Sequence, residues 1–390
     1  MKTGKLHIWV PELIAREGGI QSYSIEMVEA AMEILGPEKV TVISKSDRTV
    51  ALRRKLGKKV RIYATGNVSS ALRTPVFALL LVLASLWERP ALILSTHANF
   101  SPVAAWLQRW RRIPAVISAH GIEVWDLAEG AIRRSLRQVT KILPVSEYTR
   151  QRMEREIGLS ADRFSIIPDT FDPSRFSPGS VPAALRKRYG LEPQDQILLS
   201  VSRLVVSEQY KGYRKILEVL PRLIRAFPRL KFVLVGRGDD RANVEALIRH
   251  FALEKRVVLT GYVPESELAD HYRMADVFAM PSKREGFGIV FLEAMGCGIR
   301  CLGGNKDAAV DALRHGELGI LVDPDNGQEL EAGLSRLLSE SKPDPQKIHD
   351  QANHYFGRSA FRAKVRALLE SFGLRPDEYE SGILDMAEGK

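Results

Sequence analysis

The chain has 390 residues, of which 45% are hydrophobic and 27% charged, and these proportions exclude a disordered or fibrous protein. A single hydrophobic core stops growing at about 250–300 residues, so we expect two domains, 1–180 and 181–370, and a tail at 371–390 that packs back on the first domain. Only two cysteines occur and no signal-peptide-like region follows the start, so we expect a cytoplasmic location rather than a disulfide-bonded secreted protein.

The positive charge is concentrated in the first half of the chain. Residues 1–180 contain 26 Lys and Arg and 17 Asp and Glu, whereas the formal net charge of the whole chain is +10. The densest basic stretches are Arg53–Lys59, Trp106–Arg112 and Arg133–Arg137. Such a surface suits nucleic acid, an anionic membrane or an anionic substrate, and a solvated basic face without a partner is an equally good interpretation.

Short apolar runs alternate with helical stretches along the whole chain. The first half contains seven runs, Leu6–Val10, Val40–Ser44, Val60–Tyr63, Leu92–Ser95, Ala115–Ser118, Ile142–Val145 and Phe164–Ile167. After a pause between Phe176 and Gln196, the second half adds Ile197–Val201, Phe232–Val235, Val257–Leu259, Val277–Met280, and weaker candidates around Cys301 and at Ile320–Val322. The pattern predicts an α/β protein with two Rossmann-like, doubly wound domains, which bind ligands where strands end, in a cleft between them.

One apolar run is longer than a strand. Thr74–Trp87 comprises fourteen residues between Arg73 and Glu88. A membrane-spanning helix needs about 18–20 apolar residues. We therefore expect a buried helix here.

Two segments in the first half carry candidate site residues directly after predicted strands. Gly18 and Gly19 precede a helical run, where glycines and a helix N-terminus suit a phosphate or sugar, although a tight turn explains them equally well. His120, followed by Gly121, can exchange a hydrogen bond with a ligand near neutral pH, but a lone histidine is more often structural. For His97 the structural interpretation is stronger.

Two basic residues follow the first strand of the second half. Arg203 ends that strand and Lys211 opens the next helix, so a guanidinium and an ammonium group can neutralise a diphosphate together. Solvated surface cations are the alternative. The glycines in Gly236–Asp240 resemble a dinucleotide-binding loop but lack its third glycine, so we expect a turn there.

The segment from Pro281 to Gly296 is the strongest candidate site. Its glycines permit an exposed loop, and a helix that begins near Gly288 directs free backbone N–H groups at a ligand, as phosphate oxygens require. Glu285 can accept hydrogen bonds from sugar hydroxyls, and Glu293 can bind a vicinal diol such as a ribose. The alternative is a capping loop with two surface glutamates.

These motifs together resemble the large family of retaining glycosyltransferases with the GT-B fold, of the family four (group 1) type, over about residues 5–370. By this similarity Glu285 contacts the donor sugar, Glu293 the nucleotide ribose, and Arg203 with Lys211 the diphosphate. The resemblance also implies that the donor site includes Gly18, Gly19, His120, Val263, Gly286, Phe287, Gly288 and Ile289. Two segments depart from the family pattern, Pro168–Asp172 and Asn305–Ala309.

The resemblance implies a retaining hexosyltransferase that uses a UDP- or GDP-sugar and a hydroxyl acceptor, in cell-envelope polysaccharide or glycolipid synthesis. No cofactor and no catalytic metal are expected, since Asp323–Asp325 is better interpreted as a turn. The first domain would bind a glycan or lipid-linked acceptor. Its positive charge suits the anionic inner face of the membrane, and no nucleic-acid partner is expected. Alternatives are a cytosolic transferase of the sucrose-phosphate-synthase type, a sugar-nucleotide epimerase and a catalytically silent binding protein.

Overall fold

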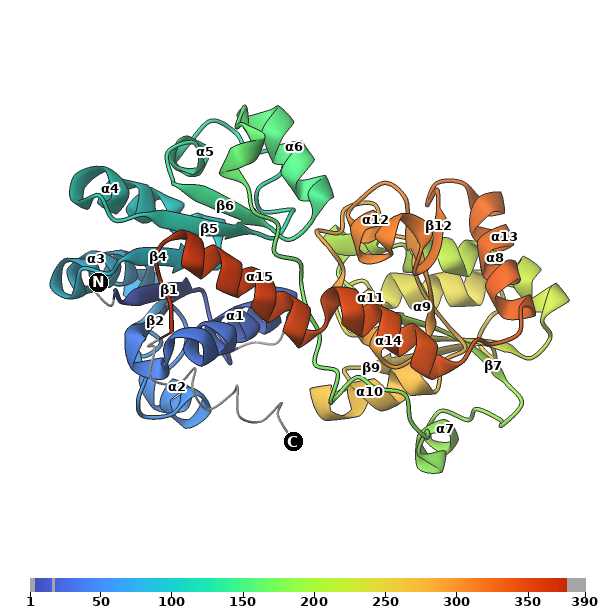
Figure 1. Cartoon of the computed structure of the whole chain (residues 1–390). Helices are drawn as coiled ribbons and strands as arrows, with labels where there is room; N and C mark the ends of the chain where they lie inside the picture. The colour runs from blue at the N-terminus through green and yellow to red at the C-terminus, as the bar shows by residue number, and fades with distance from the viewer. Residues whose placement is uncertain (1–3, 16–17, 377–390) are drawn as a thin grey trace. The chain divides into compact units, whose positions relative to one another are not determined.

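The computed structural model describes residues 4–15 and 18–376, and the chain forms two compact units (Figure 1). Unit 1 comprises Met1–Pro168 with Phe361–Lys390, and unit 2 comprises Asp169–Ala360. Most of the predicted tail, 377–390, lies outside the described residues. Each unit contains one parallel six-stranded sheet, so the predicted fold class, two Rossmann-like α/β units, is confirmed.

The division between the units falls at residue 168 rather than at the predicted 180. Phe171 forms an isolated bridge with Gly357, and the Thr170 hydroxyl donates to the carbonyl of Phe356 at 2.7 Å, so the segment after Pro168 already packs with unit 2. Helix α15 (Arg358–Ser371) returns to unit 1, where the ring of Phe361 packs edge-on against Tyr23.

Unit 1 has the strand order β3-β2-β1-β4-β5-β6. Its strands are β1 (Leu6–Val10), β2 (Val40–Ser44), β3 (Arg61–Ala64), β4 (Leu92–Ser95), β5 (Ala115–Ala119) and β6 (Lys141–Pro144). Its helices, besides α15, are α1 (Gly19–Leu35), α2 (Thr49–Leu56), α3 (Ser70–Glu88), α4 (Ser101–Arg111), α5 (Ala131–Leu136) and α6 (Glu147–Ile157).

The predicted seventh strand of the first half, Phe164–Ile167, does not form. The segment runs beside β6, with N–H groups of Ser165 and Ile167 donating to the carbonyls of Ile142 and Pro144. Pro144 has no N–H to return a hydrogen bond, so the ladder is interrupted and a single bridge remains.

The expectation that Thr74–Trp87 is a buried helix is wrong. Helix α3 has 19 residues, and its buried side chains are Phe77, Leu81, Ala84 and Ser85. Its length and composition would suffice to cross a membrane, yet only 22% of its apolar window is buried. One face of the helix packs on unit 1, whereas the opposite face is exposed although it is also apolar, and composition alone does not distinguish this arrangement from full burial.

Unit 2 has the strand order β12-β11-β10-β7-β8-β9. Its strands are β7 (Gln196–Val201), β8 (Leu230–Val235), β9 (Val257–Gly261), β10 (Val277–Met280), β11 (Arg300–Gly304) and β12 (Gly319–Val322). Its helices are α7 (Ala183–Arg188), α8 (Tyr213–Ala226), α9 (Arg241–His250), α10 (Glu265–Arg273), α11 (Ile289–Gly296), α12 (Ala309–Ala312), α13 (Gly327–Ser339) and α14 (Pro345–Phe356), with a 3-10 helix at Val206–Lys211. Parallel strands end at one edge, so the loops after β7, β8, β10 and β11 meet there.

Candidate active site

Two glycines allow the loops at this edge of unit 2 to approach one another closely. A Cβ on Gly212 would lie 2.2 Å from the carbonyl oxygen of Pro281, so the chain after Lys211 lies directly against the end of β10. A Cβ on Gly236 would lie 1.8 Å from the carbonyl oxygen of Ser202, so the loop after β8 supports the loop that carries Arg203. The segment Gly236–Asp240, predicted to be a turn, ends in a turn at 239–240, directly before α9 begins at Arg241.

Lys211 and Glu285 form an ion pair at the centre of these loops. Both side chains are largely buried, and the Lys211 ammonium group donates to Glu285 Oε2. Burial alone would lower the pKa of Lys211, but the charge of Glu285 and its hydrogen bond outweigh this effect and raise it. Lys211 is therefore cationic at neutral pH, and its charge is balanced by Glu285.

Arg203 lies on the same edge but is far more exposed, at 74% of its side chain. Its guanidinium group pairs with Glu208, whose Oε2 is buried and has no hydrogen-bond partner among the described residues. Burial raises the pKa of Tyr210, and the charges of Lys211, Glu208, Glu285 and Arg203 all act on it. The charges of Arg203 and Lys211 thus both act on Tyr210. Each cation also has an acidic partner, Glu208 for Arg203 and Glu285 for Lys211.

Asp307 holds the loop that carries Glu285, a role that no local sequence pattern indicates. Its carboxylate is fully buried and accepts the backbone N–H groups of Glu285 at 2.7 Å and Ala309 at 3.0 Å. The carbonyl of Glu285 in turn accepts the N–H of Ala308. Burial raises the pKa of Asp307 to about 6 against these hydrogen bonds. The segment 305–309, whose role the sequence left open, therefore positions the main chain of the candidate site.

The turn before α11 has the predicted form. Gly288 has a φ of +94°, in the left-handed region, and caps the helix that begins at Ile289. The ring of Phe287 is buried against Phe356, with centroids 5.5 Å apart. Only the backbone of Phe287 is then available to a ligand, together with that of Gly286 and the N–H groups at the start of α11, of which that of Phe291 already donates to the carbonyl of Gly288.

Glu293 lies within α11 and is partly buried. Its Oε2 accepts a hydrogen bond from the Tyr272 hydroxyl at 2.7 Å. Burial raises the pKa of Glu293 to about 7, although this hydrogen bond and the charge of Arg175 oppose the shift. The charge of Glu265, which begins α10 two residues after the predicted Val263, also acts on Glu293. Tyr272 is a further residue of this site, and no sequence pattern indicates it.

His120 lies at the carboxyl end of β5 in unit 1. Its Nε2 contacts the carbonyl oxygen of Thr96 at 2.8 Å, and Tyr23 packs edge-on against its ring. Burial lowers the pKa of His120 to about 4, so the ring is neutral at pH 7. Because a carbonyl only accepts, Nε2 carries the proton and Nδ1 is left as a hydrogen-bond acceptor. His97 has a structural role, since its Nδ1 accepts the N–H of Asn99 at the start of a short helix.

The glycine pair of unit 1 stands where helix α1 begins. Gly18 is the residue before α1 and its carbonyl accepts the N–H of Ser22, whereas Arg16 and Glu17 lie outside the described residues. The loop between β1 and this point is held by Asp47, whose buried carboxylate accepts the N–H groups of Leu13, Ile14 and Ala15. Gly19 is the first residue of the helix. The predicted strand-to-helix turn is therefore present, with a loop between the two elements.

Asp323–Asp325 is a turn, as predicted. The N–H of Asn326 donates to the carbonyl of Asp323, and both carboxylates pair with Lys306. Among the residues that the structure describes, no group of three or more His, Cys, Asp or Glu side chains is arranged to hold a metal ion.

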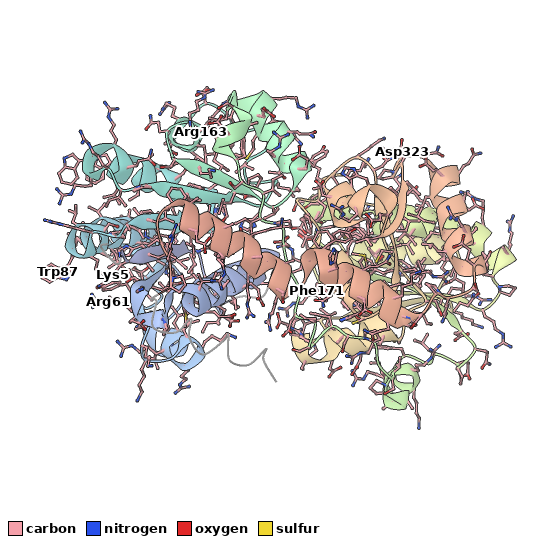
Figure 2. All side chains as sticks on the ribbon, viewed as in Figure 1. Lys5, Arg61, Trp87, Arg163, Phe171 and Asp323 are labelled. Atoms are coloured by element: carbon pink, nitrogen blue, oxygen red, sulfur yellow. The ribbon has the colours of Figure 1, made fainter. Side chains whose placement is uncertain are left out.

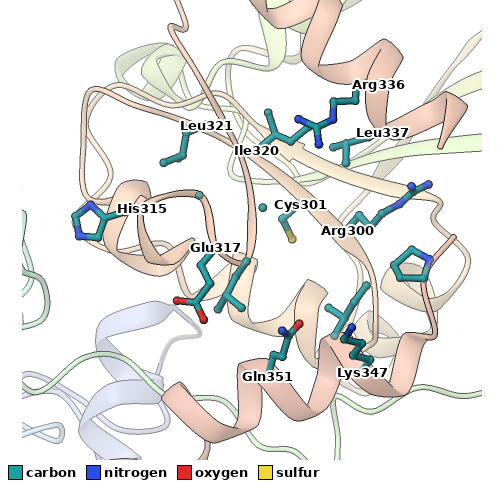
Figure 3. A pocket seen from close by; sticks show the side chains of 15 residues that line it. Arg300, Cys301, His315, Glu317, Ile320, Leu321, Arg336, Leu337, Lys347 and Gln351 are labelled. Atoms are coloured by element: carbon teal, nitrogen blue, oxygen red, sulfur yellow. The ribbon is translucent and has the colours of Figure 1, made fainter. Parts of the chain in front are cut away.

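A hollow of about 620 Å³ lies elsewhere on unit 2 (Figure 3). Residues of β11, β12, α13 and α14 line it, and none of the predicted site residues does. Its charged and polar side chains are Arg300, His315, Glu317, Arg336, Lys347 and Gln351.

The fold is that of the GT-B class. The HepE protein of Anabaena, solved in complex with UDP, superposes with a TM-score of 0.77 over 94% of this chain and 100% of its own, at 19% identity. Sucrose-phosphate synthase from Thermosynechococcus elongatus superposes with a TM-score of 0.68 over 98% of both chains, also at 19% identity. Identities this low establish the architecture alone.

Sequence comparison identifies the family. Residues 17–175 match the family described as Glycosyltransferase Family 4 and residues 183–355 match Glycosyl transferases group 1, so the chain belongs to the group 1 glycosyltransferases with the GT-B fold. A GDP-mannose-dependent α-(1-6)-phosphatidylinositol monomannoside mannosyltransferase from Mycolicibacterium smegmatis is 33% identical over 60% of this chain and 62% of its own length. A D-inositol 3-phosphate glycosyltransferase from Rhodococcus opacus is 29% identical over 74% of this chain and 69% of its own. The chain thus matches less than two thirds of the length of the first mannosyltransferases.

Proposed function

We propose that the chain transfers a hexosyl group from a nucleotide-diphosphate sugar, UDP- or GDP-linked, to a hydroxyl acceptor with retention of the anomeric configuration. The observation that carries this proposal is the largely buried Lys211–Glu285 ion pair beside the glycine turn that begins α11, in a chain of this family. A diphosphate that binds Lys211 would release the Glu285 carboxylate, which can then accept hydrogen bonds from the sugar hydroxyls.

The transfer step needs no enzymic nucleophile. The acceptor oxygen forms a bond to the anomeric carbon on the face from which the phosphate departs, and the acceptor proton passes to an oxygen of the leaving phosphate. The departing nucleoside diphosphate gains negative charge, which Arg203, Lys211 and the first-turn amides of α11 stabilise in place of a metal ion. In unit 1, Nδ1 of neutral His120 would accept a hydrogen bond from a hydroxyl of the donor sugar.

The names of the relatives guide the choice of substrates to test. GDP-mannose comes first as donor, since the mannosyltransferases of Mycolicibacterium and Corynebacterium are described as GDP-mannose-dependent, and UDP-glucose comes next because HepE was solved with it. Phosphatidylinositol monomannosides and inositol 3-phosphate both carry a phosphate, which the positive charge of residues 1–180 would favour. We therefore propose an anionic, phosphate-bearing acceptor and a role in cell-envelope glycolipid synthesis on the cytoplasmic side.

A small, soluble acceptor is the second candidate. A 2-deoxystreptamine glucosyltransferase from Streptomyces kanamyceticus is 28% identical over 54% of this chain, and the acceptor in its name is a small molecule rather than a lipid. Transfer to soluble acceptors and none to lipid-linked ones would favour this candidate.

Donor binding and transfer are tested separately. A thermal-shift panel of GDP-, UDP- and ADP-sugars should identify the donor, because a ligand that binds only the folded state raises its melting temperature. Transfer is then measured for Lys211→Met and Glu285→Gln, and we expect at least about a thousandfold loss in each, in variants whose circular dichroism shows that they still fold. Near-wild-type transfer in either variant would refute the site.

The product and the cofactor requirement complete the test. The anomeric configuration of the product, read from its NMR coupling constants, should be that of the donor, and activity should survive a metal chelator. Donor consumption without any acceptor would point to an epimerase instead, and donor binding without turnover to a silent binding protein.

A further inference from the structure

Most of the exposed large apolar side chains of unit 1 lie on two helices, α3 and α4. Of the twelve large hydrophobic side chains that are exposed in the described part of the chain, seven lie on these two helices. On α3 they recur at steps of three and four residues and so share one face, opposite the buried one. We call this surface the α3–α4 face; its residues are Leu72, Val76, Leu79, Leu83, Trp87, Trp106 and Trp110.

Three tryptophans stand toward the ends of the two helices. Helices α3 and α4 lead into neighbouring strands, β4 and β5, and pack against each other (Figure 1). Trp87 is 83% exposed and projects from the end of α3 (Figure 2). On α4 the rings of Trp106 and Trp110 lie 5.0 Å apart, and the guanidinium of Arg111 lies 4.9 Å above the ring of Trp110. Tryptophan is enriched where proteins meet the headgroups of a bilayer, because its ring is both apolar and a hydrogen-bond donor.

The charges around this face are almost all positive. Between residues 70 and 89 and between 101 and 112 the chain has five arginines and one acidic residue, Glu88. The Glu88 side chain is buried, where it accepts hydrogen bonds from Thr41 and Tyr63 and pairs with Lys5 and Arg61, so it does not offset the arginines at the surface. Of the three basic stretches in the first half, the one at 106–112 borders the apolar surface.

We propose that the α3–α4 face is a docking surface for an anionic phospholipid bilayer, in which α3 lies in the plane of the interface. The apolar stripe would enter the boundary between headgroups and acyl chains, and the arginines of α4 would contact lipid phosphates. The helix does not span the membrane, because Phe77, Leu81 and Ala84 pack on the core of unit 1 and Glu88 is fixed to the sheet. This surface carries none of the donor-site residues, so the proposal goes beyond the proposed transfer reaction and is tested without it.

A second copy of the chain is the competing occupant, and charge argues against it. A self-complementary contact would bring the arginines of α4 from both copies into one interface, and neither helix offers an exposed carboxylate to balance them. An anionic bilayer supplies that balance.

Binding is measured with the full chain and vesicles of phosphatidylcholine alone or with phosphatidylglycerol. We expect cosedimentation with the anionic vesicles that weakens as salt is raised. Brominated acyl chains should quench the fluorescence of Trp87, Trp106 and Trp110, whereas Trp9 and Trp125, which are buried, should stay unquenched. Absence of binding to anionic vesicles at low salt would overturn the proposal, and so would binding without quenching.

Two pairs of variants assign binding to this face. Leu79→Glu/Leu83→Glu should weaken vesicle binding by about tenfold or more, since a carboxylate is strongly disfavoured at acyl-chain depth. Val50→Glu on α2 is the control, because Val50 is 67% exposed but lies outside the face, and it should bind as the wild type does. Equal losses in the variant and the control would overturn the proposal.

The matched charge variants are Arg109→Glu/Arg111→Glu and, as control, Lys58→Glu/Lys59→Glu. Both double variants change the net charge of unit 1 equally. If α4 contacts the lipid phosphates, Arg109→Glu/Arg111→Glu should weaken vesicle binding at least about tenfold more than Lys58→Glu/Lys59→Glu does. Light scattering of the chain without lipid provides the remaining check. The proposal would be overturned if the wild type formed a dimer, did not bind vesicles, and became monomeric in Leu79→Glu/Leu83→Glu. The α3–α4 face would then be the interface with a second copy.

Discussion

The protonation of Glu293 makes the proposed ribose contact measurable by a pH titration. The carboxylate accepts the Tyr272 hydroxyl on one oxygen, and burial raises its pKa to about 7. The charged groups that act on it are Arg175, which favours the ionised form, and Glu265, which opposes it. A vicinal diol donates two hydrogen bonds, which an ionised carboxylate accepts and a protonated one cannot accept in full. Donor binding should therefore require ionised Glu293.

The expected size of the effect follows from the pKa. With a pKa of about 7, roughly one tenth of the Glu293 side chains are ionised at pH 6 and roughly nine tenths at pH 8, so the Kd of a nucleotide sugar should fall by up to about tenfold, or ~1.4 kcal/mol. The stability of the unliganded protein should change in the opposite direction. A folded-state pKa above the ordinary value of 4.5 stabilises the fold at low pH, and this contribution is lost as the pH rises through about 7.

Calorimetric titration with the intact nucleotide sugar between pH 6 and 8 measures the affinity. The intact sugar is preferable, since a terminal phosphate itself titrates at about pH 6. Glu293→Gln should remove the pH dependence, and Tyr272→Phe should move it to higher pH because the hydroxyl no longer stabilises the ionised form. Asp307, with a pKa of about 6, is the other carboxyl that could titrate here, and Asp307→Asn should keep the slope. A wild-type Kd independent of pH, or a slope that persists in Glu293→Gln, would refute the reasoning.

Two further predictions concern how the site loops are held. Gly212→Ala places a Cβ 2.2 Å from the Pro281 oxygen at a φ of +84°, and should lower the free energy of unfolding in urea by about 3 kcal/mol or more. Gly190→Ala is the control, because Gly190 has a φ of +62° and open space around it, and it should cost about 1 kcal/mol. Equal losses in the two variants would contradict the close approach at Gly212. Asp307→Ala should lower kcat/KM about a hundredfold by freeing the Glu285 main chain, and Asp307→Asn should restore part of it; a fall in melting temperature with unchanged kinetics would show that Asp307 serves stability alone.

The fold was largely predictable because periodicity and chain punctuation act locally. Buried parallel strands appear as short β-branched runs, and the two six-stranded sheets follow from them. The predictions that were wrong concern features that depend on tertiary packing. Phe164–Ile167 has the composition of a strand, but whether it pairs depends on Pro144, some twenty residues earlier. Whether α3 is buried on both faces depends on what packs there, and its residues alone do not specify that.

The site was predictable where residue types stand at strand ends, and less so where partners are distant in sequence. Lys211 and Glu285 were each expected to meet a ligand, yet in the structure they meet each other across 74 positions. Asp307 and Asp47 were not predicted, because a carboxylate that accepts N–H groups from a segment distant in sequence has no local sequence pattern. The role of His120 also depends on its surroundings. Burial lowers its pKa to about 4, and the contact of Nε2 with the Thr96 carbonyl leaves Nδ1 of the neutral ring as a hydrogen-bond acceptor.

The charges of the candidate site in unit 2 should favour the intact nucleotide sugar over the free nucleoside diphosphate. Arg203 is paired with Glu208 and Lys211 with Glu285, so the four groups sum to zero before a ligand arrives. A nucleoside diphosphate without its sugar would take Lys211 and leave Glu285 beside the phosphates without hydroxyls to bind, which is repulsive. The intact donor gives Glu285 a new partner. Glu285→Gln should therefore bind the free nucleoside diphosphate more tightly than the wild type while it loses transfer, and calorimetry that shows weaker binding in this variant would contradict the proposed exchange of partners.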